Sequence, residues 1–523
     1  MSEASTDRVG RIVIVGGGSA GWIVAGMLAS EYRDDAGVSV ALVESPDVKT
    51  IGVGEGTWPT MRTTLQRIGI SETEFLAGCS GAFKQGTKFA GWVTGEDDDY
   101  YYHPFSAPVG YVDLNLVPYW QKQNNDVSFV DAVSIQGRIC DRNLAPKQAE
   151  TPEYAHVANY AYHLDAGKFA ALLQNHCTKK LGVRHVLDHV ASIEGDPDGD
   201  IRAVRTVANG DIEGDLFVDC TGFAALLLGK HYGVPYLDKQ NILFNDSALA
   251  VQVPYADENS PIASQTISTA RGAGWIWDIG LTTRRGIGYT YSSAHTTDDE
   301  AKAVLGDYIE QTSGVAAKDV EARKIRFTPG HRAKFWHQNC VAVGMSAGFL
   351  EPLEASALVL VELAARMISE ELPANRGVMD IVAKRYNDKF LYRWDRIIDF
   401  LKLHYVLSQR EDSRYWSDNR EAASIPGSLQ ELMRLWNYHA PGRQDFSHAD
   451  EVFSAASYQY VLCGMGFETQ ARLSSRQASA ASKAEILFAG NAHRAQQVVP
   501  KLPGNRELLA TINKRGLPTS DAA

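Results

Sequence analysis

The sequence predicts an α/β protein, with a Rossmann-like domain that is interrupted by an inserted sheet region and followed by a helical C-terminal region. Three observations support this fold class. A short apolar strand near the N-terminus runs into a glycine-rich turn at 16–21, strand-and-turn patterns recur at 216–222 and 340–348, and helix-period apolar spacing dominates after residue 384.

The first pattern is the strongest local signal. A buried parallel strand is predicted from Arg11 to Val15, and a helix from Trp22 to Tyr32. Glycines in such a turn let the backbone approach a pyrophosphate, and the N-terminus of the helix offers unpaired N–H groups. The turn therefore predicts a dinucleotide site, although a turn used only for tight packing is the alternative. The predicted binding residues are Gly16, Gly18, Ser19, Ala20 and Gly21, whose glycines fit the spacing G-x-G-x-x-G.

A second strand, "VSVALVE", ends at Glu44, which lies 23 residues after Gly21. A Rossmann unit places the acid that bonds a ribose hydroxyl at about this distance. Glu44 is therefore predicted to bind the ribose.

The later patterns define the domains. Strand-to-turn patterns spread over more than 300 residues indicate a discontinuous nucleotide domain at 8–390. Segments at about 75–190 and 240–325 are predicted to be inserted on the substrate side. Residues 391–515 are predicted to form a mainly helical region that completes the substrate chamber.

Composition excludes several classes of protein. A net charge of −12 argues against a nucleic-acid partner, because such binding depends on clustered Lys and Arg. The six cysteines are scattered without metal-ligand spacing, so no metal is expected and the thiols are expected to be reduced. The polar N-terminus and the absence of a long apolar run predict a cytoplasmic protein with no membrane partner.

Several separated motifs, from residue 16 to residue 416, resemble those of the flavin-dependent halogenases of the tryptophan-halogenase type, in the order found in that family. They are "GGGSAGW", "IGVGEGTWP" (51–59), "GAFKQGTKFAGW", "GWIWDIG" (274–280), "GFLEPLEASA" (348–357) and "LHYVLSQREDSRYW" (403–416). The resemblance implies a domain of the flavin monooxygenase type that binds FAD, with Gly54, Glu55 and Gly348 as further cofactor residues.

The resemblance also implies a reaction. Reduced FAD activates oxygen, a bound chloride or bromide is oxidised to hypohalous acid, and this oxidant halogenates an electron-rich aromatic such as an indole. Because only one complete nucleotide fingerprint is present, a separate NAD(P)H-dependent flavin reductase is expected as a partner. A homodimer is a further expectation.

Two residues match the family's catalytic positions. Lys84 matches the lysine that guides the oxidant, and we prefer it to Lys88 because it follows a Gly-x-aromatic triplet. If residues 83–89 are extended, Lys84, Gly86 and Lys88 share one face. The alternative is a solvated lysine on a strand edge.

Glu354 matches the acid that assists the substitution. A helix is predicted to begin near Pro352, which suits a first helical turn. In that position Glu354 could instead serve only to complement the helix macrodipole.

The resemblance implies further site residues. The backbone N–H groups of Ser356 and Ala357 are expected to bind the halide, and the departure from the family's Ser-Thr-Gly at this point puts the preferred halide size in question. His103, Phe105, Trp275 and Trp277 are expected on the substrate side; for the two tryptophans, packing within the core is the alternative.

Other activities use a similar fold. An FAD-dependent aromatic monooxygenase that hydroxylates its substrate would need no halide and neither of the two catalytic residues. A flavoprotein that reduces lipid alkenes and a non-catalytic flavin sensor are the remaining alternatives. No counterpart of the aromatic and acidic cluster that binds the charged groups of free tryptophan is recognised around "DEVFSAASYQYVLCGMGF", which favours indole-like or other electron-rich aromatics over free tryptophan.

Overall fold

The computed structural model describes residues 8–48, 54–123, 127–448 and 450–519. The chain divides into two compact units, each made of three segments. The first unit comprises the chain up to Cys79, Leu164–Lys239 and Thr328–Trp394. The second unit comprises Ser80–His163, Gln240–Phe327 and the chain from Asp395 onward.

The unit boundaries differ from the predicted insertion at about 75–190. The corresponding segment of the second unit ends at His163. The reason is helix α7 (Ala166–Lys180), which packs against helix α1 (Ser19–Glu31) and so belongs to the first unit. The other predicted insertion, at about 240–325, has nearly the same bounds as the segment Gln240–Phe327 of the second unit.

The first unit is built on a six-stranded sheet. Its neighbouring strands pair in parallel, except for the short edge pair β20–β21. The predicted α/β class with a Rossmann-like parallel sheet is therefore confirmed. In spatial order the strands are β20 (Trp336–His337), β21 (Cys340–Ala342), β12 (Leu216–Asp219), β1 (Arg11–Val15), β2 (Ser39–Glu44) and β8 (Arg184–Leu187).

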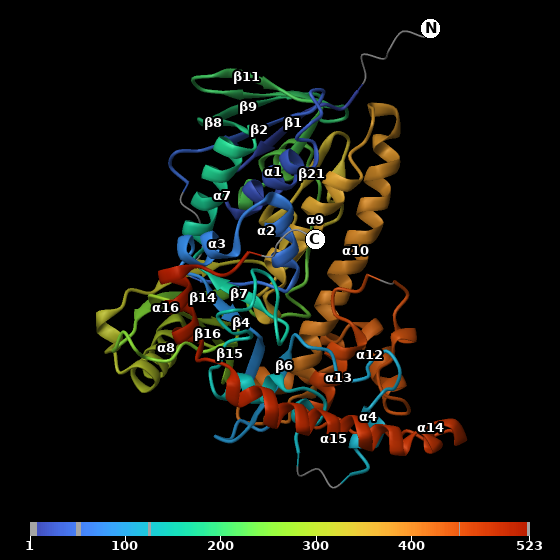
Figure 1. Cartoon of the computed structure of the whole chain (residues 1–523). Coiled ribbons are helices and arrows are strands. Elements are labelled where there is room, and N and C mark those ends of the chain that lie inside the picture. Colours follow the sequence, from blue (N-terminus) through green and yellow to red (C-terminus); the bar gives the residue numbers. More distant parts are fainter. Residues whose placement is uncertain (1–7, 49–53, 124–126, 449, 520–523) are drawn as a thin grey trace. The chain divides into compact units, whose positions relative to one another are not determined.

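Helix α1 is the central helix of this unit (Figure 1). It packs against α7 and against α9 (Ser356–Glu370), and it is buried on nearly every side, with Trp22 fully enclosed. A Cβ atom on Gly26 would lie within about 3.2 Å of Ile68 and Cys177, so this glycine lets α2 (Thr60–Ile68) and α7 approach closely. Helix α3 (Glu72–Gly78) also contacts α7.

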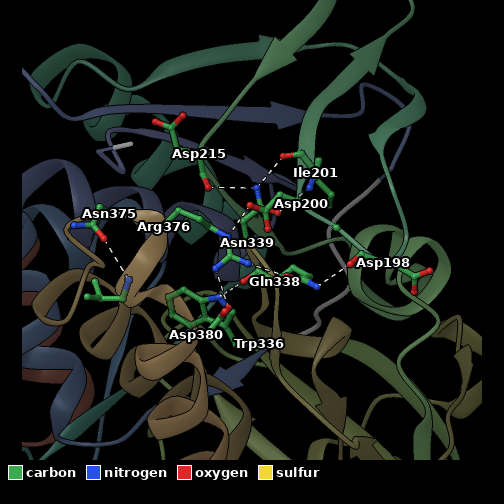
Figure 2. A network of polar contacts seen from close by, with 12 residues as sticks. Asp198, Asp200, Ile201, Asp215, Trp336, Gln338, Asn339, Asn375, Arg376 and Asp380 are labelled. Atoms are coloured by element: carbon green, nitrogen blue, oxygen red, sulfur yellow. Dashed lines mark hydrogen bonds and ion pairs between the residues drawn. The ribbon is translucent and has the colours of Figure 1, made fainter. Parts of the chain in front are cut away.

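Two small sheets complete the first unit. One pairs β9 (Val190–Gly195), β10 (Ile201–Thr206) and β11 (Gly210–Glu213); the other pairs β13 (Tyr236–Asp238), β19 (Gly330–Arg332) and β22 (Gly348–Phe349). Figure 2 shows the polar network that ties β10 to the main sheet. The side-chain amide of Asn339 bonds both the N–H and the C=O of Ile201, at 2.9 and 2.8 Å, and also the carbonyl of Asp215.

The second unit contains a seven-stranded sheet, which is antiparallel except where β15 pairs with β5. Helix α8 (Asp298–Ser313) covers one face, where Leu305 and Ile309 pack on Ile276 and Ile287. Trp275 and Trp277 flank Ile276 and point to the opposite face. The strand order is β18 (Arg323–Arg326), β14 (Ser247–Pro254), β17 (Arg284–Tyr291), β16 (Gly274–Gly280), β15 (Thr266–Arg271), β5 (Gly86–Ala90) and β6 (Tyr100–Pro104).

The rest of the second unit is mostly helical. β4 (Ala82–Lys84) pairs with β7 (Ala161–Leu164), and short helices α4 (Val117–Trp120), α5 (Phe129–Val133) and α6 (Gln136–Asp141) lie between them in the chain. No helix in the described ranges is both long and apolar enough to cross a membrane. The C-terminal part confirms the predicted helical region, with α10 (Arg376–Leu407), α11 (Arg414–Arg420), α12 (Gly427–Trp436), α13 (Ala455–Gly464), α14 (Ser475–Ser479), α15 (Ala481–Val498) and α16 (Asn505–Arg515).

Candidate active site

The glycine turn between β1 and α1 has the geometry that a dinucleotide site requires. Gly16 has a φ of +115°, and a Cβ atom there would lie 2.2 Å from the carbonyl oxygen of Cys220. A Cβ atom on Gly21 would lie 1.9 Å from the carbonyl oxygen of Gly16. On Gly18, in contrast, a Cβ atom would meet no heavy atom within 4 Å. The space over Gly18, at the N-terminus of α1, therefore fits a pyrophosphate.

Ser19 and Ala20 form the first residues of α1, and no side chain caps this helix. Glu44 ends β2, as predicted, and its carboxylate lies against Gly17. One carboxylate oxygen accepts a 2.9 Å hydrogen bond from Nε2 of His185 on β8. The ring of His185 packs edge-on against Trp22. These contacts hold Glu44 in place, with a second oxygen to offer a ribose hydroxyl.

The motif at 51–59 is described only from Gly54 onward, and its residues 51–53 lie outside the described residues. Gly54 is buried, and Glu55 begins the short strand β3 (Glu55–Gly56). Desolvation raises the pKa of the Glu55 carboxyl to about 7. At the end of the motif, the indole Nε1 of Trp58 donates a 2.8 Å hydrogen bond to the backbone carbonyl of Glu354.

The helix that was predicted to begin near Pro352 begins later, at Ser356. Residues Leu353–Ala355 form a 3₁₀ turn in which Glu354 and Ala355 have φ values of +63° and +54°. Two consecutive left-handed residues cannot continue a right-handed helix, which corrects the placement of Glu354 in a first helical turn. The side chain of Glu354 is 6% exposed.

Ser356 and Ala357 are the first two residues of α9. Ser356 is buried and Ala357 is exposed. The residue before them, Ala355, has no side-chain acceptor, so no side chain caps these backbone N–H groups. The N-terminus of α9 therefore has the polarity to attract an anion. Gly348 lies in β22, where a Cβ atom would be 2.6 Å from the carbonyl oxygen of Gly330, so close strand pairing accounts for this glycine.

The predicted extended segment at 83–89 is two strands in two sheets. β4 ends at Lys84 and β5 begins at Gly86, which has a φ of +147°. A Cβ atom on Gly86 would lie 2.4 Å from the carbonyl oxygen of His103, so the close approach of β6 requires glycine here. The expectation that Lys84 and Lys88 share one strand face is therefore wrong.

The side chain of Lys84 is 1% exposed, which rules out a solvated lysine on a strand edge. Its ammonium lies 5.2 Å from the centre of the Phe105 ring. On the paired strand β7, burial and then the positive charge of Lys84 hold the pKa of His163 well below its usual range. Nε2 of His163 lies 2.9 Å from Oγ1 of Thr266.

Lys88 has different surroundings. It is partly exposed, and its ammonium lies 3.8 Å from the centre of the Tyr100 ring, which is itself exposed. Burial lowers the pKa of Lys88, while Asp141 acts in the opposite direction. The two lysines therefore have different surroundings, because Lys88 lies between the exposed ring of Tyr100 and the buried ring of Tyr102, while Lys84 is itself fully buried.

His103 and Phe105 lie at the end of β6, among aromatic rings. The His103 ring lies 5.6 Å from Phe400 and 6.3 Å from Phe453, measured between ring centres. Phe400 and Phe453 stack on each other at 3.8 Å. His103 therefore lies among the rings of Phe400 and Phe453, while Phe105, two residues later, lies beside Lys84.

Trp275 and Trp277 lie edge to face, 6.3 Å apart, on β16. Trp277 stands opposite Gly288 on β17, where a Cβ atom would be 2.1 Å from its ring. Trp275 lies 6.3 Å from Trp92 and is 1% exposed. Core packing therefore accounts for Trp275. The ring of Trp277 packs directly on the backbone of Gly288, which fixes its position.

Three residues that the sequence did not single out hold the candidate residues in place. Gln85 links β4 to its surroundings, because its N–H donates to Ser264 and its carbonyl accepts from Phe105. His163 faces Lys84, and Trp58 holds the carbonyl of Glu354. Gln85 lies in the motif that carries Lys84, and Trp58 lies in the motif at 51–59, so both stand within segments that the sequence drew attention to; nothing local pointed to His163.

Comparison with known proteins gives one consistent result. The family model described as tryptophan halogenase matches residues 11–481. The tryptophan 6-halogenase SttH of Streptomyces toxytricini is 33% identical, over 98% of this chain and 100% of its own length. A tryptophan halogenase from Shewanella frigidimarina NCIMB 400 has a crystal structure with a TM-score of 0.95 and 50% identity, covering 98% of this chain and 99% of its own. Tar14, a tryptophan C-6 flavin-dependent halogenase (chlorinase) from taromycin biosynthesis, has a TM-score of 0.89 and 35% identity, covering 96% and 99%.

Proposed function

The chain belongs to the tryptophan halogenase family and is a flavin-dependent halogenase, and we propose that it halogenates an electron-rich aromatic such as an indole. The observation that carries the substrate side of this proposal is the burial of Lys84 beside Phe105 and the neutral His163. The hydroxylase alternative is not favoured, because the similar proteins are halogenases.

FAD fits the residues of the first unit. When bound in its reduced form, it would supply the activation of oxygen. The glycine turn would hold the pyrophosphate over Gly18, and Glu44 would bond the ribose. Glu55, whose carboxyl is partly protonated near pH 7, and the buried Gly54 would line the flavin, as would Gly348.

The halide would bind at the start of α9. The backbone N–H groups of Ser356 and Ala357 are directed along the helix axis, and the positive end of the macrodipole favours an anion there. The left-handed pair Glu354–Ala355 supports this arrangement, because it makes α9 begin at Ser356 and leaves the N–H groups at that end without helical partners.

Two side chains would act on the oxidant. The Lys84 ammonium would bind the hypohalous acid and direct it to the substrate, because a buried cation in aromatic surroundings attracts a polar oxidant strongly. Glu354 would accept the proton that leaves the ring as aromaticity is restored, since its side chain is largely shielded from water.

Aromatic side chains would hold the substrate. His103 and Phe105 would line the chamber near Lys84, and Trp277, supported by Gly288, would limit access from the sheet face, with Trp275 behind it. The C-terminal region would complete this chamber through Phe400 of α10 and Phe453, which lies just before α13.

The test is an incubation of the purified chain with FAD, oxygen, NADH, a separate flavin reductase and either bromide or chloride. A panel of indoles and phenols serves as substrate, and mass spectrometry detects the products. We expect a halogenated indole only when both halide and reductase are present. A hydroxylated product formed without halide would contradict the proposal, as would rapid reduction of FAD by NADH with the chain alone.

A further inference from the structure

Helix α9 carries a buried glutamate that the proposed reaction does not use. Glu362 is 4% exposed, and its carboxyl accepts hydrogen bonds from two hydroxyl groups of α2. These are Oγ1 of Thr64, at 2.6 Å, and Oγ1 of Thr60, at 3.2 Å. Burial raises the pKa of Glu362 to about 8, and the two hydroxyls act in the opposite direction.

A leucine would fill this position at a smaller desolvation cost, so the polar contact contributes something other than apolar packing. Two specific hydrogen bonds fix the register and rotation of α2 on α9, which apolar contacts alone leave less well defined. The two bonds hold the first half of α2, because Thr60 is the first residue of that helix and Thr64 lies one turn later.

The beginning of α2 lies two residues after Trp58, whose indole holds the carbonyl of Glu354. Glu354 and Ala355 need such support, since a left-handed conformation costs about 1–2 kcal/mol for each residue that is not glycine. If the indole moved away, both residues could relax to right-handed values and α9 would extend toward Leu353. The N–H groups of Ser356 and Ala357 would then bond carbonyls of their own helix, and Glu354 would rotate with the new turn.

We propose that Glu362 is a positioning residue: through Thr60 and Thr64 it fixes the start of α2, and thereby keeps Trp58 on the carbonyl of Glu354 and α9 from extending over the halide site. The inference rests on the proposed function of Glu354, Ser356 and Ala357. It adds a residue that touches neither cofactor nor substrate, and it identifies the contact through which that residue acts.

The test compares three variants in halogenated product formed per oxygen consumed. Glu362→Gln keeps the shape of the side chain and can still bond both hydroxyls, because its amide oxygen accepts from one threonine while its NH2 group donates to the other, so its yield should stay close to that of the parent. Glu362→Leu removes both hydrogen bonds and should lower the yield about 10- to 100-fold, as a small misplacement of a catalytic group does, with an unchanged KM for the aromatic. If Glu362→Leu does not fold, Thr64→Val removes the shorter bond in a milder way and takes its place.

Glu370→Gln is the matched control. It breaks the exposed ion pair between Arg67 and Glu370, whose charged groups lie 2.6 Å apart. This pair joins α2 and α9 near their C-terminal ends. Because this pair is far along the helix from Trp58, its loss should leave the yield unchanged. An equal loss of yield in Glu370→Gln and Glu362→Leu would mean that general loosening of the two helices is responsible, and would overturn the proposal.

Two further measurements separate the inference from the proposed function. In a Glu354→Gln background, Glu362→Leu should cause a smaller additional loss of yield than in the parent, because the part of its effect that acts through Glu354 is already lost and only the part that acts through the halide site remains; losses that multiply in full would overturn the inference. In the apoprotein, Glu362→Leu should speed hydrogen exchange in peptides covering 54–68 and 353–358, while Glu362→Gln should not. Unchanged hydrogen exchange would also overturn the inference.

If the parent chain forms no halogenated product at all, the proposed function fails, and the exchange result still decides whether Glu362 holds this contact.

Discussion

The ammonium of Lys84 lies 5.2 Å from the centre of the Phe105 ring, in a position where the lysine is 1% exposed. A buried charge of this kind needs compensation, and the face of an aromatic ring provides part of it. Lys88, four residues later, rests on Tyr100 near the surface. The two lysines of one short motif therefore have separate surroundings and should respond differently to substitution.

We expect Lys84→Ala to bind FAD and to consume oxygen at the parent rates while its halogenated product falls by a factor of about 100 to 10,000, because a positioned catalytic group is lost. Product formation and oxygen consumption are measured together in the coupled assay. Lys88→Ala is the control and should be mild. Near-parent halogenation by Lys84→Ala, or an inactive Lys88→Ala, would show that the wrong lysine was assigned.

Replacing Gly18 should separate cofactor binding from folding. Gly18 has an ordinary extended conformation and open space around its Cβ position, so Gly18→Val should fold and melt like the parent. It should nevertheless lose at least about 1.4 kcal/mol of FAD affinity, or tenfold, in a fluorescence titration. Gly21→Ala is the contrasting variant, since its Cβ atom would clash with Gly16 and should lower the melting temperature. Unchanged FAD affinity in Gly18→Val would contradict the placement of the pyrophosphate.

The start of α9 should prefer bromide to chloride. Ala355, Ser356 and Ala357 stand where the resemblance implies Ser-Thr-Gly, so a capping hydroxyl is absent before the halide site, and within the site position 356 lacks a methyl group while position 357 gains one. A competition assay with equal concentrations of both halides should give more brominated than chlorinated product. An excess of chlorinated product would refute this prediction.

The network in Figure 2 predicts where the first unit is most sensitive to a polar deletion. Asn339 is 2% exposed and satisfies both backbone groups of Ile201, so Asn339→Ala should cost about 2–4 kcal/mol by leaving them buried without partners. Arg376→Ala removes partly exposed contacts with Asp200, Asp380 and Gln338 and should cost less than Asn339→Ala, because water can replace them. Denaturant unfolding measures both; equal losses would contradict the ranking.

Glu362 should make stability depend on pH. Its pKa is about 8 in the folded chain against an ordinary value of 4.5, so between these values the folded state binds more protons than the unfolded state. Stability therefore falls as pH rises through this window. Glu362→Gln removes this cost and should be more stable than the parent by on the order of a few kcal/mol at pH 8.5, with little difference below pH 4.5.

Thermal unfolding at several pH values checks this prediction through the difference between Glu362→Gln and the parent. The difference matters because burial also raises the pKa values of Glu55, to about 7, and of Asp399, to about 6. Those groups titrate in both proteins and cancel. A difference in melting temperature that stays constant from pH 4.5 to pH 8.5 would contradict the assignment.

Local patterns predicted part of this structure correctly. The strand Arg11–Val15 has the predicted bounds, and the helix after it starts three residues earlier than predicted, at Ser19. Both depend on residues that are neighbours in the chain, where apolar runs and glycines directly report backbone conformation. The burial of Lys84 could be anticipated only through its place in a motif, because an isolated lysine in the sequence indicates a solvated side chain.

The features that could not be predicted depend on distant partners. Gly86, where the strand breaks, is approached by the carbonyl of His103, and Glu354, just before the delayed helix, is bonded through its carbonyl by Trp58, almost 300 residues earlier. His185 reaches Glu44 from another strand in the same way. Tertiary contacts of this kind override local propensity and leave no periodic trace in the sequence.

The hydrogen bond from Trp58 to the carbonyl of Glu354 also offers a criterion for distinguishing active from inactive relatives by sequence. The proposed halide site is made of main-chain groups, and its shape depends on two left-handed backbone angles that an indole supports. A survey that asks only for the lysine and the glutamate would therefore accept chains that keep both side chains but have lost this geometry. A search for active relatives should require a hydrogen-bond donor at position 58 as well, so that degenerate copies are set aside before any are expressed.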